Sequence, residues 1–202
     1  MAKKYYAVRK GRQTGIFESW DECKRLVTGY KNASFKGFDD LAEAQAFING
    51  TSADALPSAQ PEKDTAIAYV DGSYNAKTKV FAYGVVLFFE NREVTLSNAC
   101  SDPTLAEMRN VAGEIKGAKT AMQFCIDNNI PKLYIYYDYE GIEKWCSGEW
   151  KTNKLGTIEY KKYYDSVKSL LDVHFIKVKG HSGNRYNDAA DLLAKEAAGI
   201  KV

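Results

Sequence analysis

The chain has no long hydrophobic run: none of its 202 residues belongs to a segment near the roughly 20 apolar residues that a membrane-spanning helix needs. Its first residues, Met-Ala-Lys-Lys-Tyr-Tyr, lack the apolar core of a signal peptide. On the sequence alone we therefore expect a cytoplasmic protein with no membrane partner.

Cysteine and histidine are scarce, at four and two residues. The cysteines are far apart, form no C-x-x-C pair and have no histidine at zinc-binding spacing, which argues against a zinc site. We expect free, mostly buried thiols in a reducing compartment. The four are Cys23, Cys100, Cys125 and Cys146.

The net charge of +2 is unevenly divided. Residues 1–50 hold nine Lys and Arg against six acidic residues, whereas the rest of the chain is close to balanced. A basic first quarter favours a polyanionic partner there, although so small an excess does not establish one.

Residues 1–49 are expected to form a small α+β module, called the N-terminal module below. Ser19 with Glu22 matches a capping box at the start of a helix, and Asp40 is placed to cap a second helix that ends at Gly50. The expected strands are 5–9, 16–17 and 33–38. Residues 50–65 are small and polar, contain two prolines and read as a flexible linker.

Residues 66–202 are expected to form an α/β domain with a mixed sheet and helices on both faces. The expected strands are 66–70, 80–89, 93–99, 132–137 and 173–178, and the expected helices are 104–126, 141–145, 160–170 and 187–198.

Four acidic residues occupy positions where this pattern of strands and helices predicts few charged side chains. Asp71 and Asp138 follow apolar strands, Glu114 borders the apolar stripe of a helix, and Asp191 lies on the inner side of the last helix. Any one of them alone has an ordinary structural explanation. Brought together they would repel one another unless hard cations neutralised them, and oxygen ligands select Mg²⁺ or Mn²⁺. Two such ions about 4 Å apart are a known device for phosphodiester hydrolysis.

The motifs that carry these acids resemble those of type 1 ribonuclease H. They are Asp71-Gly72-Ser73, the segment 109–114, Tyr137-Asp138 and the segment 180–194. The resemblance implies a five-stranded sheet of order 3-2-1-4-5 and endonucleolytic hydrolysis of the RNA strand of RNA–DNA hybrids, giving 5′-phosphate and 3′-hydroxyl ends. It also implies that Asp71, Glu114, Asp138 and Asp191 bind the metal ions. Asp188 is an alternative metal ligand to Asp191, but the motif spacing favours Asp191.

The same resemblance implies further site residues. His181, in a glycine-flanked loop, would transfer a proton or help to release the phosphate, whereas His174 is expected to be structural. Asn110 would contact the RNA strand, with help from Asn75 and Arg109. Residues 143–159 hold no cluster of basic residues, so the basic protrusion of many family members is expected to be absent.

Residues 4–48 resemble the hybrid-binding domain that precedes many ribonucleases H. By that resemblance Tyr6, Trp20 and Phe35 would contact the deoxyribose strand and Lys36 would face the RNA. Gly37 stands where the family often has a second lysine, which favours a reduced affinity. The alternative for Trp20 and Phe35 is a small aromatic core.

Three functions are compatible with this sequence. The first is a monomeric, Mg²⁺-dependent (or Mn²⁺-dependent) nuclease that its own module tethers to the hybrid. The second is a hybrid-binding protein with a silent nuclease fold, against which the presence of all four acids argues. The third is a DNA-cutting relative of the transposase or integrase kind, because a fold does not determine a substrate.

Overall fold

The computed structural model describes most of the chain and divides it into two compact units, residues 1–59 and 60–202. The described residues are 4–31, 33–39, 41–49, 64–178 and 184–201. The predicted linker therefore lies almost wholly outside them, and its last residue, Thr65, is the first residue of a strand. Among the described residues, no helix combines the length and apolar character needed to span a bilayer.

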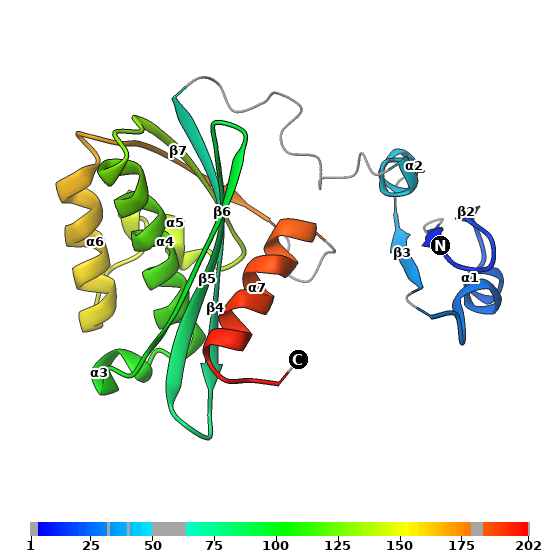
Figure 1. Cartoon of the computed structure of the whole chain (residues 1–202), viewed down its shortest axis with the longest axis horizontal. Coiled ribbons are helices and arrows are strands. Elements are labelled where there is room, and N and C mark those ends of the chain that lie inside the picture. The colour runs from blue at the N-terminus through cyan, green and yellow to red at the C-terminus, as the bar shows by residue number, and fades with distance from the viewer. Residues whose placement is uncertain (1–3, 32, 40, 50–63, 179–183, 202) are drawn as a thin grey trace. The chain divides into compact units, whose positions relative to one another are not determined.

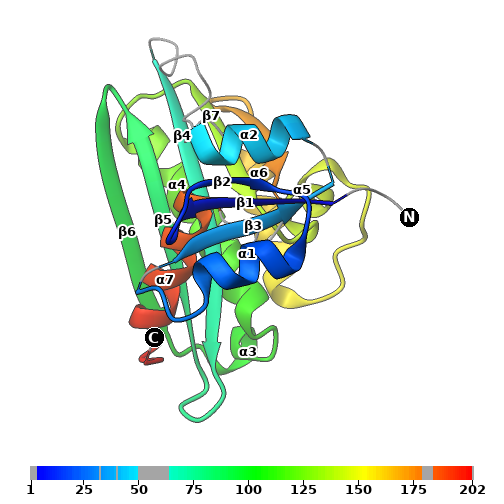
Figure 2. The same cartoon turned by 90° about the vertical axis from the view of Figure 1, so that its right-hand side faces the viewer.

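The N-terminal module is a three-stranded antiparallel sheet with one helix on each face (Figure 2). Alternate residues of the central strand supply the two faces: Ala7 packs with Phe47 of one helix, and Val8 packs with Cys23 of the other. The sheet order is β2-β1-β3. The elements are β1 (Tyr5–Lys10), β2 (Gly15–Phe17), α1 (Trp20–Val27), β3 (Ser34–Phe38) and α2 (Leu41–Asn49).

One local prediction for this module is wrong. Ser19 is the N-cap of α1, but its side chain makes no capping hydrogen bond, so the capping box with Glu22 does not form. The carbonyl oxygen of Ser19 accepts from the backbone N–H of Cys23 at 3.2 Å, which is the first hydrogen bond of the helix.

Residues 60–202, called the C-terminal domain below, contain a five-stranded mixed sheet of order β6-β5-β4-β7-β8, which confirms the predicted 3-2-1-4-5 arrangement. Strand β4 pairs antiparallel with β5 and parallel with β7. The strands are β4 (Thr65–Asn75), β5 (Val80–Phe89), β6 (Arg92–Cys100), β7 (Lys132–Tyr137) and β8 (Asp172–Lys177). The helices are α3 (Pro103–Ala106), α4 (Asn110–Asp127), α5 (Gly141–Ser147), α6 (Leu155–Val167) and α7 (Arg185–Ala197).

Helices cover both faces of this sheet, with α4 and α6 on one side and α7 on the other (Figure 1). Alternation along β4 explains the division. Val70 joins the core formed with Ile115 of α4, whereas the neighbouring Tyr69 meets Tyr186 of α7 with ring centroids 5.3 Å apart.

The helix predicted over 104–126 is in fact two helices. Asp102 caps α3 by accepting from the backbone N–H groups of Thr104 and Leu105, and α3 ends at Ala106. Arg109 then has φ 53° and ψ −130°, outside the right-handed helical region, so α4 starts in a new direction at Asn110. Periodicity cannot reveal such a break, because apolar residues continue on both sides of it.

Two further predicted boundaries are displaced. Strand β4 was expected to end at residue 70 but continues to Asn75, because β5 pairs with it along its whole length. Helix α6 begins at Leu155 rather than 160, and the hydroxyl of Thr157 bonds both the N–H and the C=O of Lys154 just before it. Residues 148–154 link α5 to α6 without an additional helix, a shorter connection than the predicted segment 146–159.

Candidate functional site

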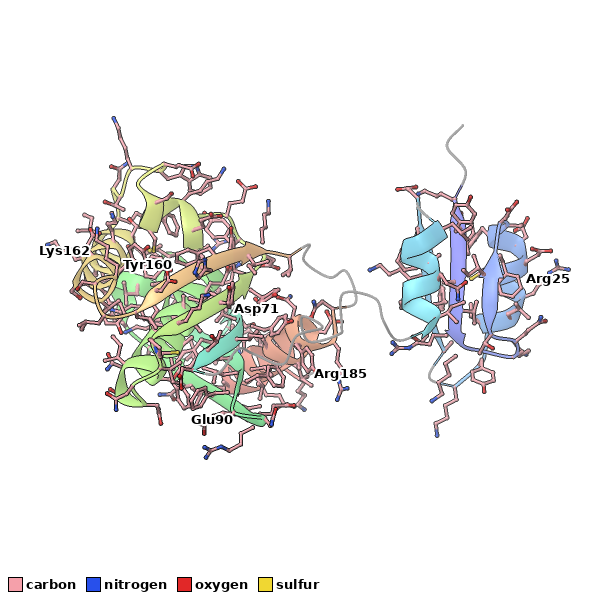
Figure 3. All side chains as sticks on the ribbon, turned by 90° about the horizontal axis from the view of Figure 1, so that it is seen from above. Arg25, Asp71, Glu90, Tyr160, Lys162 and Arg185 are labelled. Carbon is pink, nitrogen blue, oxygen red and sulfur yellow. The ribbon has the colours of Figure 1, made fainter. Side chains whose placement is uncertain are left out.

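Asp71 lies inside strand β4, at the point where one neighbouring strand stops pairing. The last β7 pair with β4 is Tyr69↔Tyr136, whereas β5 continues and places Gly84 opposite Asp71. Asp71 is therefore buried among the strands, while Glu90 and Arg185 lie at the domain surface (Figure 3). The end of the parallel pairing leaves space beside Asp71, and Asp138 directly follows β7 there.

Two glycines bring Glu114 to this place. A Cβ on Gly72 would lie 2.2 Å from the carbonyl oxygen of Asn110, and one on Gly113 would lie 2.1 Å from that of Ala82. Only glycine at both positions allows the backbone of α4 to pack this closely against β4 and β5. Glu114, the next residue, is 3% exposed and is held in the interior beside Asp71.

Asp71, Glu114 and Asp138 form a compact carboxylate trio. One oxygen from each lies within 4.8 Å of the others. Burial, followed by the charge of Asp138, raises the pKa of Asp71 to about 7. Burial together with Asp138 and Asp71 raises the pKa of Glu114 to about 9, against the effect of a 3.3 Å hydrogen bond from the Asn110 amide. Burial and the neighbouring acids thus favour the protonated, uncharged forms of Asp71 and Glu114.

Asp191 approaches the trio from α7. A Cβ on Gly84 would lie 2.0 Å from the carbonyl oxygen of Ala190, so α7 rests directly on β5 opposite Asp71. The Asp191 charge contributes to the raised pKa of Asp71, and the Lys195 charge opposes it. The Nζ atom of Lys195 lies 2.6 Å from Oδ2 of Asp191. Sequence reasoning missed Lys195, although its spacing of four residues from Asp191 predicts such a pair on a helix.

These acids line an open cleft with polar neighbours from several elements. The lining residues are Asp71, Gly72, Ser73, Tyr74, Arg109, Asn110, Glu114, Asp138, Asp191 and Lys195. The structure therefore brings all four predicted acids together, along with Arg109 and Asn110. Asp188, the alternative to Asp191, is exposed on the first turn of α7.

The donor chemistry of this cleft fits divalent cations. Its charged ligand groups are all carboxylates, which suits Mg²⁺ or Mn²⁺ and not metals that prefer sulfur or imidazole. Asn187, one turn before Asp191, is 3% exposed, and its Oδ1 atom is the buried side-chain oxygen without a hydrogen-bond partner among the described residues.

Asn75, proposed from the sequence to help bind nucleic acid, has a structural contact instead. Its amide nitrogen donates to the carbonyl oxygen of Ala198 at 3.0 Å, and its Oδ1 accepts from the backbone N–H of Lys77 at 3.1 Å. Asn75 thereby joins the end of α7 to the end of β4. A role in binding stays a prediction.

Of the two histidines, the structure describes only His174. His181 lies outside the described residues, so its predicted role is not tested by the geometry. His174 lies on β8, where its ring stacks on Tyr134 at 4.8 Å and its Nε2 atom is 2.9 Å from Asp172. It is not among the residues that line the cleft.

The N-terminal module carries an exposed aromatic row. Trp20 and Phe35 are 44% and 41% exposed, so they do not form the alternative aromatic core. The Trp20 ring lies 5.6 Å from that of Tyr6 and 6.0 Å from that of Phe35. Lys36 points to the opposite face of β3, where its Nζ lies 5.4 Å from the ring centre of Phe38.

Two family models match the chain. One, described as "Ribonuclease H1 N-terminal domain", covers residues 4–48, and the other, described as "RNase H", covers residues 63–199. Ribonuclease H1 of Mus musculus is 27% identical over 256 residues, a match that spans 96% of this chain and 89% of that protein. Ribonuclease H of Clostridium botulinum is 28% identical over 139 residues, which covers 65% of this chain and 93% of that protein.

Solved structures agree with the fold of the C-terminal domain. RNase H1 from Halobacterium salinarum matches with a TM-score of 0.56 at 21% identity, over 67% of this chain and 98% of that one. LC11-RNase H1, solved in complex with an RNA/DNA hybrid, matches with a TM-score of 0.54 at 18% identity, over 66% of this chain and 96% of that one.

Proposed function

The chain belongs to the ribonuclease H family, whose enzymes act on the RNA strand of RNA–DNA hybrids, and we propose that it cuts that strand by two-metal-ion hydrolysis. The observation that carries this proposal is the carboxylate trio of Asp71, Glu114 and Asp138, whose oxygens lie within 4.8 Å of one another. Asp191 would complete the ligand set from α7. The products would carry 5′-phosphate and 3′-hydroxyl ends.

Six residues of the cleft have proposed roles. The four carboxylates would hold two Mg²⁺ ions, with Mn²⁺ as a substitute, and Asn110 and Arg109 would position the RNA strand along the first turn of α4. When bound, the ions would activate the attacking water and stabilise the leaving oxygen. His181 would move a proton beside them, a role that is proposed from the sequence alone.

The N-terminal module would hold the hybrid through its aromatic row. Exposed rings suit stacking on the sugars and bases of the deoxyribose strand, which makes binding largely independent of sequence. Lys36, which lies on the opposite face of the edge strand β3, would neutralise a phosphate and make binding depend on salt. Connection to the nuclease within one chain would raise the effective concentration of substrate and favour repeated cuts.

The experiment that tests this function is cleavage of a hybrid labelled on its RNA strand, with double-stranded RNA and double-stranded DNA as control substrates. We expect metal-dependent cuts in the hybrid alone, loss of cutting in Asp71→Asn, and 5′-phosphate ends on the products. Tight hybrid binding without cleavage by the wild type would instead favour the silent binding protein. Cleavage of double-stranded DNA would favour the transposase-like alternative.

Separate variants test the module. Trp20→Ala removes an exposed ring, so we expect weaker hybrid binding with little change in stability. Leu41→Ala, at a residue of α2 that is also exposed, is the matched control. Equal binding by both variants would contradict the proposed aromatic row.

Two further proposals concern the cellular location and the oligomeric state of the protein. We infer that the protein works in the reducing cytoplasm, a proposal supported by its four free cysteines. We also propose that it acts as a monomer, because one chain supplies all the carboxylates and the binding module. Size measurement in solution by light scattering tests the second proposal.

A further inference from the structure

Asp191 differs from the other three acids in what it contacts. It is not a member of the trio whose oxygens lie within 4.8 Å of one another. Its Oδ2 atom instead lies 2.6 Å from Nζ of Lys195, and both side chains line the same cleft as the trio. The carboxylate of Asp191 therefore already has a cation beside it, supplied by the protein itself.

The position of this pair is determined by how α7 packs along β4. Odd-numbered residues of β4 from Asp71 to Asn75 face α7, because the strand alternates its side chains between the two faces. Asn75 holds the end of α7 through the Ala198 carbonyl at 3.0 Å. Lys195, one helical turn after Asp191 and just before that anchored end, is therefore kept within reach of the carboxylates.

An ammonium group and a divalent ion cannot both occupy the same carboxylate oxygen. We propose that Lys195 is an internal cation that competes with the second divalent ion for Asp191. Without that ion, the ammonium neutralises Asp191. When the ion binds, Asp191 turns to it and the released ammonium stays in the cleft, where it can pair with the anionic backbone of the substrate.

Lys195 would thus be a positioning residue that acts through Asp191 and sets the ion concentration at which the site fills. The inference rests on the proposed two-ion function of the carboxylates. It concerns binding of the ions, and it can be tested without substrate and without cleavage.

The test is titration of Mn²⁺ into the full-length protein by calorimetry, with free Mn²⁺ followed by electron paramagnetic resonance. Lys195→Met removes the ammonium and keeps the length of the side chain, so we expect the weaker of two ion sites to tighten about fivefold, the value of a partly exposed ion pair. The stronger site should change little. Lys195→Arg keeps the charge and should bind like the wild type.

Lys168→Met is the matched control, because Lys168 also pairs with a helical aspartate, Asp165, at 2.7 Å but lies at the C-cap of α6 and does not line the cleft. It should leave both affinities unchanged. If Lys195→Met destabilises the fold, Lys195→Gln provides a second neutral variant.

The outcomes separate this inference from the function on which it rests. An unchanged or weaker second site in the neutral variants, with two ions bound by the wild type, would overturn the role of Lys195 alone. A protein that binds no second ion in any variant would overturn the two-ion proposal as well. A second ion that binds only after Lys195 is neutralised would support the competition.

Discussion

Gly72 of β4 and Gly113 of α4 lie in direct backbone contact: a Cβ on Gly113 would be 2.9 Å from the Cα atom of Gly72. Real Cβ atoms do not approach other atoms so closely, and backbone cannot move aside as a flexible side chain can. This contact places Glu114 beside Asp71, so the geometry of the carboxylate trio depends on two residues that carry no functional group.

Gly113→Ala should therefore impair both the fold and the site. We expect a loss of about 3 kcal/mol or more in the free energy of unfolding, because the new methyl meets the backbone of β4 and β5. Gly117→Ala, one turn along the same helix, is the control: its Cβ would make ordinary contacts of 3.4 Å or more, so alanine should stabilise α4 by about 0.5–1 kcal/mol. Urea unfolding of the two variants measures the difference, and similar stabilities would contradict the role of the contact.

Removing divalent ions should make the stability of the protein fall as pH rises. The folded-state pKa values of Asp71 and Glu114, about 7 and about 9, lie above the values near 4 of an unfolded chain. Below about pH 4 the folded and unfolded states hold the same number of protons on these two groups. Above pH 4 the folded state keeps protons that the unfolded state has lost. Stability should therefore decline between about pH 4 and pH 9.

The measurement is urea unfolding in a chelator at pH 5.5 and 8.5. Glu114→Gln should flatten the decline and be more stable than the wild type at pH 8.5 by several kcal/mol, because the pKa of Glu114 is raised by several units and each unit corresponds to about 1.4 kcal/mol. Glu107→Gln changes an exposed residue and should leave the pH profile as it is. Saturating Mg²⁺ should reverse the decline in the wild type. A wild-type profile that rises with pH in chelator would contradict the raised pKa values.

Arg109→Gly should separate stability from substrate binding. Arg109 has φ 53°, a backbone conformation that is strained for a residue with a Cβ atom. Glycine should therefore raise the free energy of unfolding by about 1 kcal/mol. The substitution also removes a cation from the cleft. We expect a higher melting temperature together with a higher KM for the hybrid. Lys79→Gly is the control, since Lys79 has φ 58° and is exposed outside the cleft. It should gain stability with KM unchanged; a rise in KM in both variants would argue against a specific contact by Arg109.

Gly37→Lys should strengthen hybrid binding by the N-terminal module. Gly37 pairs with Tyr6 on the face that carries the aromatic row, and its Cβ would lie 3.5 Å from the Tyr6 ring, so a side chain fits. One more phosphate contact should raise the affinity and steepen its salt dependence by about one unit of log–log slope. Ser34→Lys adds the same charge to the other face of β3 and should have a smaller effect. Fluorescence anisotropy with a labelled hybrid at several salt concentrations distinguishes the two.

Local patterns in the sequence were sufficient for much of this protein. Alternating and helical periodicities predicted the order of strands and helices. The carboxylates could be selected by their positions after apolar strands (Asp71, Asp138) and on the inner sides of helices (Glu114, Asp191). These features depend on residues near one another in the chain. The motif series then predicted the family that the comparisons show.

The tertiary structure decided how those elements meet. The continuation of β4 past Asp71 depends on its pairing with β5, and the break at Arg109 depends on where α4 must lie to bring Gly113 against Gly72. The placement of the Asp191–Lys195 pair in the cleft, though not the pairing itself, and the outward stacking of Trp20 likewise depend on contacts between elements. Such contacts join residues that are distant in the chain, so no local pattern encodes them and only the packed structure determines the distances on which the chemistry depends.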